Sequence, residues 1–305
     1  MVQGRRSRWV ERGLDSGAFA TAAGWSGRVM TRPARVARLV PPSALAVRPV
    51  SFASRSGSNI RAWLLGGSPG AGAILLLHGV GDNRSSMVAR ARFLHRAGYT
   101  VLLPDFQAHG ESEGARITFG ALESLDAESA LAFLRASSGG ERVGMIGVSM
   151  GGAAALLGAG QFPADAYVLE SVYPTIRQAL EGRLGAWLGP LGMLKRVIAP
   201  HVMQGVSAEI GIGEDALRPI DFIGRVGAPV FVLTGSRDAY TPLVEARALF
   251  ERARDPKEFW AVDGARHEDL HAFAGGTYEQ RVGDFLARHL RAAPAHSPAL
   301  GVSSR

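Results

Sequence analysis

The feature that most constrains the fold of this chain is a series of continuous apolar runs separated by segments long enough to form helices. The runs are residues 73–78, 100–105, 142–147, 166–170, 229–234 and 258–262. Between them lie helix-length segments such as 83–97, 119–136 and 244–254. Uninterrupted apolar runs are typical of strands that are covered on both faces, as the strands of parallel sheets are. The alternation therefore predicts an open, mostly parallel α/β sheet with helices on both faces, in one domain.

Two further patterns complete the predicted architecture. The runs 50–54 and 60–66 flank the polar turn 55–59, which predicts an antiparallel hairpin at the front of the sheet and brings the number of strands to eight. Residues 171–228 are too many for a simple crossover, so we expect a small cap inserted over the carboxyl edge of the sheet. The sequence predicts three parts. These are a basic, poorly ordered extension over 1–47, the folded domain over 48–293 with the cap at about 172–225, and a flexible tail over 294–305.

The basic charge of the chain is concentrated near its beginning. The formal net charge is +7, but residues 1–38 contain eight arginines against only Glu11 and Asp15. The rest of the sequence carries 26 basic and 25 acidic side chains, so it is nearly neutral. A basic groove for nucleic acid is therefore not expected. The absence of cysteine excludes a thiol nucleophile and cysteine-ligated metal sites.

Targeting signals and membrane spans are not expected in the sequence as given. Arg5 and Arg6 resemble the start of a twin-arginine leader, but Glu11, Arg12 and Asp15 interrupt the apolar stretch that such a leader needs. The sequence therefore favours a cytoplasmic location over export. Residues 143–160 carry no charge, yet their glycines predict a strand, a tight turn and a helix rather than a stable membrane span.

The most informative motif lies where the run 142–147 ends. Residues 147–151 read Gly-Val-Ser-Met-Gly and fit the pattern G-x-S-x-G, and the small residues that follow predict a helix. Gly147 and Gly151 are needed because a sharp turn brings the strand and helix backbones close together. Such a turn would lift the Ser149 hydroxyl above the sheet, beside a helix N-terminus that favours negative charge. The motif predicts Ser149 as a nucleophile; the alternative is a glycine-rich turn with a solvated serine.

With this motif, the chain resembles serine hydrolases of the α/β-hydrolase superfamily over about residues 48–290. It is most similar in pattern to small esterases and serine aminopeptidase-like hydrolases, whose first parallel strand ends in His-Gly, here His78-Gly79. The resemblance implies the α/β-hydrolase fold with a mostly parallel eight-stranded sheet. It also implies catalysis without a cofactor or a metal ion.

The resemblance also implies the partners of the nucleophile. In this superfamily the acid follows a late strand and the base follows the last one, which selects Asp238 and His267 to complete a triad with Ser149. His271, one helical turn after His267, remains an alternative for the base. Asp263 remains an alternative for the acid.

The same resemblance assigns an oxyanion hole and its supports. The residue after His-Gly and the residue after the nucleophile donate backbone N–H groups, which are those of Val80 and Met150 here. The expected supporting residues are His78, Gly79, Gly147 and Gly151. Residues 105–112 match the turn Asp-x-x-x-His-Gly-x-Ser that fixes loop geometry near such sites. A metal role for His78, Asp105 and His109 is not expected, because their spacing resembles no known ligand set.

The expected activity is the hydrolysis of carboxylic esters or related acyl bonds of a small molecule through an acyl-enzyme on Ser149. Amidase, aminopeptidase or thioesterase activity on the same fold is the alternative within the enzymes, and a non-catalytic binding module is the alternative outside them. Seven apolar residues of the cap either line an acyl-chain pocket or pack the cap against the body: Trp187, Leu188, Leu191, Met193, Leu194, Val197 and Ile198. The oligomeric state is left open.

Overall fold

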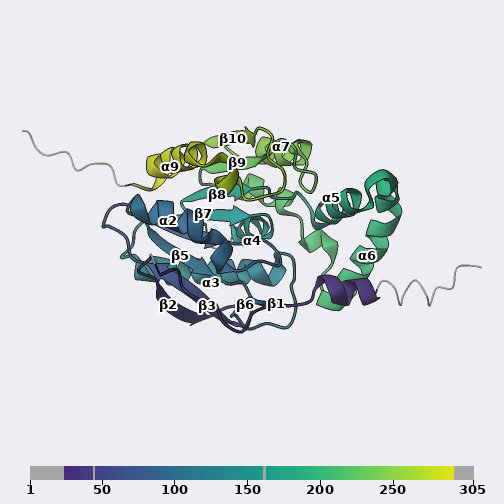
Figure 1. The fold of residues 1–305 in the computed structure, drawn as a ribbon, viewed down its shortest axis with the longest axis horizontal. Helices are drawn as coiled ribbons and strands as arrows, with labels where there is room; N and C mark the ends of the chain where they lie inside the picture. The colour runs from purple at the N-terminus through teal and green to yellow at the C-terminus, as the bar shows by residue number, and fades with distance from the viewer. Residues whose placement is uncertain (1–23, 44, 161–162, 292–305) are drawn as a thin grey trace, which may run out of the picture.

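A computed structural model describes residues 24–43, 45–160 and 163–291, and its centre is one sheet with the strand order β10-β9-β8-β7-β4-β5-β3-β2 (Figure 1). The strands are β2 (Arg48–Ala53), β3 (Asn59–Leu65), β4 (Ala73–Leu77), β5 (Thr100–Pro104), β7 (Val143–Val148), β8 (Ala166–Glu170), β9 (Val230–Gly235) and β10 (Lys257–Val262). Strand β3 is antiparallel to β2 and β5, and every other neighbouring pair is parallel. The predicted eight-stranded, mostly parallel sheet with its front hairpin is confirmed.

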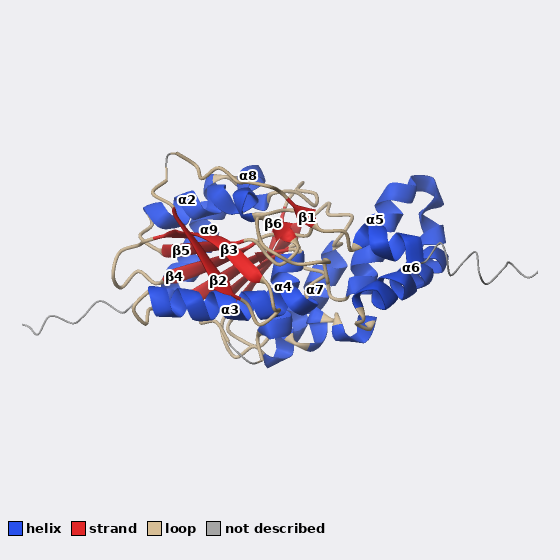
Figure 2. Cartoon of the chain, turned by 90° about the horizontal axis from the view of Figure 1, so that it is seen from below, coloured by secondary structure: helices blue, strands red, loops and turns tan. Residues whose placement is uncertain are grey.

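Helices cover both faces of the sheet (Figure 2). One layer contains α3 (Ala121–Ser137), α4 (Met150–Gly158) and α7 (Leu243–Arg252), and the other contains α2 (Val88–Arg96), α8 (Leu270–Ala274) and α9 (Gly276–Leu290). In β4, Leu75 and Leu77 face the hydrophobic cluster under the first layer, whereas Ile74 and Leu76 face the cluster under the second. All five residues of β4 are fully buried, which explains why this strand is a continuous apolar run in the sequence.

The uncharged stretch 143–160 forms β7, a sharp turn and α4, as predicted. Gly144 in β7 packs so tightly that an added Cβ would lie 2.8 Å from the Leu290 side chain of α9. In the ranges that the structure describes, no helix combines the length and the apolar character needed to cross a membrane.

A helical hairpin extends from one side of the sheet domain between β8 and β9 (Figures 1 and 2). Its elements are α5 (Ile176–Leu188), the 3₁₀ segment η2 (Gly189–Leu194) and α6 (Lys195–Ile210). The short 3₁₀ turns η3 (Glu214–Ala216), η4 (Pro219–Asp221) and η5 (Ile223–Arg225) lead back to β9. Thr175 caps the start of α5, since its hydroxyl accepts a hydrogen bond of 3.2 Å from the Gln178 N–H. This hairpin occupies the segment in which we expected a cap.

The N-terminal part of the described chain differs from the expected extension over 1–47. Residues 24–30 are helical and pack on α6, where a Cβ added to Gly27 would lie 2.3 Å from the carbonyl oxygen of Gly205. Strand β1 (Ala34–Arg35) then pairs in parallel with β6 (His109–Gly110). Residues 24–43 are therefore attached to both the hairpin and the sheet domain. Residues 1–23 and the predicted tail over 294–305 lie outside the described residues.

Candidate active site

Ser149 lies in the sharp turn between β7 and α4. Its backbone has φ 50° and ψ −114°, a left-handed conformation that is uncommon for a residue with a side chain and is typical of constrained functional turns. A Cβ added to Gly147 would lie 2.5 Å from Cα of Gly152, and one added to Gly151 would lie 2.4 Å from the Leu77 carbonyl oxygen. The two glycines of the motif are therefore required by the close approach of the strand and helix backbones.

Asp238 and His267 are joined by a hydrogen bond. Oδ2 of Asp238 lies 2.8 Å from Nδ1 of His267, and Oδ1 accepts hydrogen bonds of 2.8 Å from the N–H groups of Tyr240 and Thr241. Because an ionised carboxylate can only accept, Nδ1 of the imidazole is the donor and Nε2 of the neutral ring is left as an acceptor. The Asp238 carboxylate is fully buried, whereas the His267 ring is 20% exposed. The pair thus presents a proton acceptor at the surface of the site.

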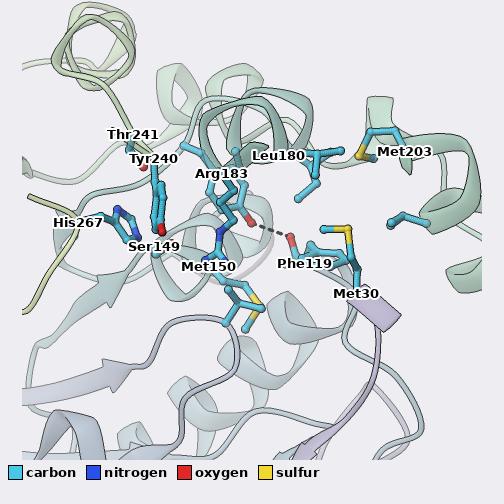
Figure 3. Close-up of a pocket in the computed structure, with 15 residues that line it drawn as sticks. Met30, Phe119, Ser149, Met150, Leu180, Arg183, Met203, Tyr240, Thr241 and His267 are labelled. Atoms are coloured by element: carbon cyan, nitrogen blue, oxygen red, sulfur yellow. Dashed lines mark hydrogen bonds between the residues drawn. The ribbon is translucent and has the colours of Figure 1, made fainter. Parts of the chain in front are cut away.

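The structure brings the three predicted residues together at one edge of the sheet. Ser149 follows β7, Asp238 follows β9 and His267 follows β10, so all three lie at the carboxyl ends of parallel strands. Ser149 and His267 line the same pocket, in which the ring of Tyr240 lies 5.1 Å from the ring of His267 (Figure 3). The three residues follow the chain in the order Ser149, Asp238 and His267, as the resemblance implied for nucleophile, acid and base.

The two alternatives that the sequence left open have other partners. Asp263 accepts a hydrogen bond of 3.2 Å from the Ser236 hydroxyl. Nε2 of His271 lies 3.1 Å from Glu279, and its ring packs beside that of Tyr278 in the layer of α8 and α9. The geometry therefore favours Asp238 and His267 over these alternatives.

The two expected oxyanion donors flank the same pocket. Val80 lies in the loop after β4 and Met150 is the first residue of α4, and both line the pocket with Ser149. The N–H of a first helical residue has no acceptor within its helix, so that of Met150 is available to a ligand. Gly79 brings the β4 loop close to the nucleophile, because its added Cβ would lie 3.8 Å from Cβ of Ser149.

His78 connects the two loops that border the site. Its Nδ1 is 2.8 Å from the Gly79 carbonyl oxygen, and its Nε2 accepts a hydrogen bond of 3.1 Å from the Phe106 N–H. Burial, together with a smaller contribution from repulsion by His109, lowers the pKa of His78 to about 3. His78 is consequently neutral and acts as a fixed bridge between the β4 and β5 loops.

The turn over residues 105–112 holds the β4 loop from the other side. The Asp105 carboxylate accepts hydrogen bonds from the N–H groups of Arg84 at 2.7 Å and Glu111 at 2.8 Å, and it pairs with the Arg84 guanidinium. Nε2 of His109 accepts a hydrogen bond of 3.2 Å from the Gly81 N–H. His78, Asp105 and His109, the residue types that could ligate a metal, therefore form hydrogen bonds with backbone groups instead. Within the described ranges, no group of three or more histidine and acidic side chains is arranged to hold a metal ion.

Two adjoining pockets meet at Ser149 and His267. The first is largely apolar, and its lining is Met30, Val80, Phe119, Met150, Tyr173, Ile176, Ala179, Leu180, Arg183, Met203, Val206, Tyr240 and Thr241. The second, which we call the polar pocket for its charged side chains, includes Asp82, Ser86, Arg90, Glu268 and Asp269, although Val80, Met87 and Val148 also line it. Burial raises the pKa of Asp82. Arg183 of α5 lines both pockets, and its guanidinium lies 5.5 Å from the centre of the Tyr240 ring.

Several residues that line the apolar pocket differ from those expected from the sequence. Met30 lines the pocket although it belongs to the predicted extension over 1–47. Arg183 also lines it, and nothing in the sequence around Arg183 indicates a role in a pocket. The place of Tyr240 in the pocket could have been predicted from the sequence, because Tyr240 lies two residues after Asp238. Most of the cap residues named from sequence neither line the pocket nor pack against the body, since five of them are exposed at the end of the hairpin: Trp187, Leu191, Met193, Leu194 and Val197. The pocket instead uses Leu180, Met203 and Val206, which lie nearer the sheet domain.

The sheet order, the helical layers and the turn that carries Ser149 are those of the α/β-hydrolase fold. The family model described as serine aminopeptidase, S33, matches residues 68–205. An uncharacterized protein of Mycobacterium tuberculosis is 28% identical over 253 residues, which are 80% of this chain and 82% of the relative.

Two further comparisons extend this result. Human alpha/beta hydrolase domain-containing protein 17B is 34% identical over 76 residues, which are 25% of this chain and 26% of that protein. Among solved structures, an esterase of Pyrococcus furiosus superposes with a TM-score of 0.72 and 23% identity, covering 86% of this chain and 98% of that one. This likeness establishes the fold that the two chains share.

Proposed function

We propose that this protein is a serine hydrolase that cleaves carboxylic esters or related acyl bonds of small molecules through an acyl-enzyme on Ser149. The observation that carries the proposal is the 2.8 Å hydrogen bond between Asp238 and His267 at the pocket that contains Ser149. The names of the related proteins support it, because esterases and serine aminopeptidases both cleave acyl bonds.

In the first half of the reaction, Nε2 of His267 accepts the proton of the Ser149 hydroxyl while Oγ attacks the substrate carbonyl carbon. Asp238 keeps Nδ1 protonated and stabilises the imidazolium that forms. The negative charge on the carbonyl oxygen is stabilised by the N–H groups of Val80 and Met150, and a donor of this kind is typically worth about 10²–10³ in rate. His267 then gives its proton to the leaving group, and the acyl group remains on Ser149.

In the second half, water replaces the leaving group. His267 accepts a proton from the water, whose oxygen attacks the acyl-enzyme carbonyl. Collapse of the second tetrahedral intermediate releases the carboxylic acid and returns the proton to Ser149. The cycle needs only protein groups and water.

The pockets suggest how an ester would bind. The side chains of Leu180, Met203 and Val206 offer an apolar surface for an acyl chain. The adjoining pocket, with Asp82 and Glu268, offers polar groups for the leaving alcohol. The proposal therefore favours esters that join an apolar acid to a polar alcohol.

A specific observation supports the aminopeptidase alternative. Asp82 and Glu268 place carboxylates in the pocket beside Ser149, where they could pair with the amino group of a peptide. Asp269 is less available, since it lies 2.8 Å from the Arg90 guanidinium. This alternative predicts that aminoacyl p-nitroanilides are cleaved and that acetylation of their amino group strongly lowers kcat/KM.

The nucleophile is tested with a fluorophosphonate probe, which reacts covalently with activated serines. We expect the wild-type protein to be labelled and Ser149→Ala to be unlabelled, as detected by mass spectrometry of the intact protein. Ser171→Ala is a matched control, because Ser171 also follows a strand and lines the polar pocket but has no imidazole partner. Equal labelling of Ser149→Ala would refute the assignment.

The substrate class is tested with p-nitrophenyl esters of increasing acyl length, compared by kcat/KM. We expect kcat/KM to rise with acyl length until the apolar pocket is filled, with each buried methylene contributing about 0.8 kcal/mol. Turnover of anilides alone would favour the aminopeptidase. Absence of turnover on both classes, together with an unlabelled wild type, would favour a non-catalytic binding module.

A further inference from the structure

The end of the α5–α6 hairpin exposes a cluster of large apolar side chains. Over residues 187–197, which we name the hairpin tip, Trp187 is 84% exposed and Met193 is 81% exposed. Leu191, Leu194 and Val197 are exposed as well. Single exposed apolar residues are normal on protein surfaces, but five within eleven consecutive residues concentrate apolar surface at one end of the hairpin, as interaction surfaces do.

The backbone of the tip explains why these side chains point outward. The backbones of Gly185 and Gly192 lie close together inside the turn, since a Cβ added to Gly192 would lie 3.3 Å from the Gly185 carbonyl oxygen. The small residues thus occupy the inside of the turn, and the large ones are left on its outer surface. In Figure 1 the hairpin stands at one end of the molecule, away from the sheet and from α2 and α9.

The charges of the tip select the kind of partner. Lys195 and Arg196 lie within it, and residues 187–197 contain no acidic side chain. An apolar patch that includes a tryptophan and is bordered by basic groups matches an anionic lipid surface, where apolar side chains enter the headgroup boundary and cations pair with phosphates. A symmetric dimer through this patch would bring Lys195 and Arg196 of both copies together.

We propose that the hairpin tip docks this protein on the surface of an anionic lipid bilayer, with Trp187, Leu191 and Met193 in the headgroup boundary. The same two helices line the apolar pocket: Leu180 on α5 lies seven residues before Trp187, about 10 Å along the helix. Docking therefore holds the pocket close to the lipid.

Docking is measured by sedimentation of the full chain with vesicles of phosphatidylcholine, alone or with phosphatidylglycerol. We expect binding to the anionic vesicles, and about tenfold weaker binding of the triple variant Trp187→Ser/Leu191→Ser/Met193→Ser. Val40→Ser/Phe273→Ser is the matched control, because it removes exposed apolar side chains elsewhere and should bind like the wild type. Lys195→Gln/Arg196→Gln should reduce the preference for anionic over neutral vesicles.

Several results would overturn the proposal. The wild type could fail to bind anionic vesicles, or the triple variant could bind them as well as the wild type. The matched control could also lose as much binding as the triple variant. A lipid-free dimer in analytical ultracentrifugation that the triple variant dissociates would assign the tip to a second copy instead. Ser149→Ala should bind vesicles like the wild type, so the outcome is independent of the proposed catalytic activity.

Discussion

The imidazoles of His267 and His78 have opposite surroundings although both belong to loops that border the same site. His267 pairs with a buried carboxylate through one nitrogen and keeps the other exposed to the pocket. His78 is fully buried, and both of its nitrogens are occupied by backbone groups. His78 therefore stays neutral between the two backbone groups, whereas His267 presents one ring nitrogen to the pocket.

The buried state of His78 predicts that the protein loses stability in weak acid. Its pKa is about 3 in the folded protein and 6.5 in the unfolded chain, so the unfolded state binds the proton first as the pH falls. The free energy of unfolding therefore begins to fall as the pH drops through 6.5, and it continues to fall down to about pH 3. At pH 5 the loss from this group is about 2 kcal/mol.

Urea unfolding at pH 7.5 and pH 5 measures this loss. His78→Gln removes the titrating group, so the variant should be less stable than the wild type at pH 7.5 but should lose less on acidification. Burial also lowers the pKa of His109, which adds to the loss in both proteins. Equal pH dependence of the two proteins would contradict the prediction.

At the level of elements, the helix over residues 24–30 completes the apolar pocket. It contributes Met30 to the lining and touches α6 through Gly27, so it joins the sheet domain to the hairpin. Any side chain at position 27 would force this helix away from α6.

We therefore expect Gly27→Val to lower the free energy of unfolding by about 1–3 kcal/mol, the usual cost of overpacking. It should also lower kcat/KM for long-chain more than for short-chain esters, because Met30 moves with the helix. Gly24→Val is the control: its added Cβ meets only the end of the Arg28 side chain, at 3.7 Å. Urea unfolding and ester kinetics on both variants are the measurements, and equal effects of the two substitutions would argue against the contact.

The strands and the nucleophile turn were predictable because their signals are local. A strand that is buried on both faces, such as β4, is a continuous apolar run, and G-x-S-x-G needs only five adjacent residues. The helix over 24–30 was missed because its packing on α6 depends on Gly205, far along the chain. The exposure of Trp187 was missed for a related reason: an apolar residue in a helical segment gives no sign of whether a partner lies opposite it.

At the scale of the whole molecule, a buried ion-pair network joins the helical layer of α2 and α9 to the sheet. The Arg90 guanidinium of α2 lies 2.7 Å from the Glu170 carboxylate at the end of β8, and the two side chains are 2% and 1% exposed. The Tyr278 hydroxyl of α9 donates to Glu170, and Arg90 also pairs with Asp269, two residues after His267. The network thus anchors the loop that carries His267.

Arg90→Ala would leave Glu170 buried without its cation, so we expect a loss of about 3–5 kcal/mol in the free energy of unfolding. Arg96→Ala is the matched control on the same helix. Its pair with Glu279 is exposed at 3.5 Å, so the loss should be about 0–1 kcal/mol. Urea unfolding of the two variants measures both losses, and a similar loss of unfolding free energy in the two would refute the role of the network.

The meeting of an apolar and a polar pocket at Ser149 has a consequence for chirality. An ester with an apolar acyl group and a polar alcohol would bind Ser149 in a single orientation. A stereocentre next to its carbonyl would then place one particular substituent near Tyr240 and His267. The two mirror-image forms of such an ester would then react at different rates, and a racemic mixture would be enriched in the slower enantiomer as hydrolysis proceeds.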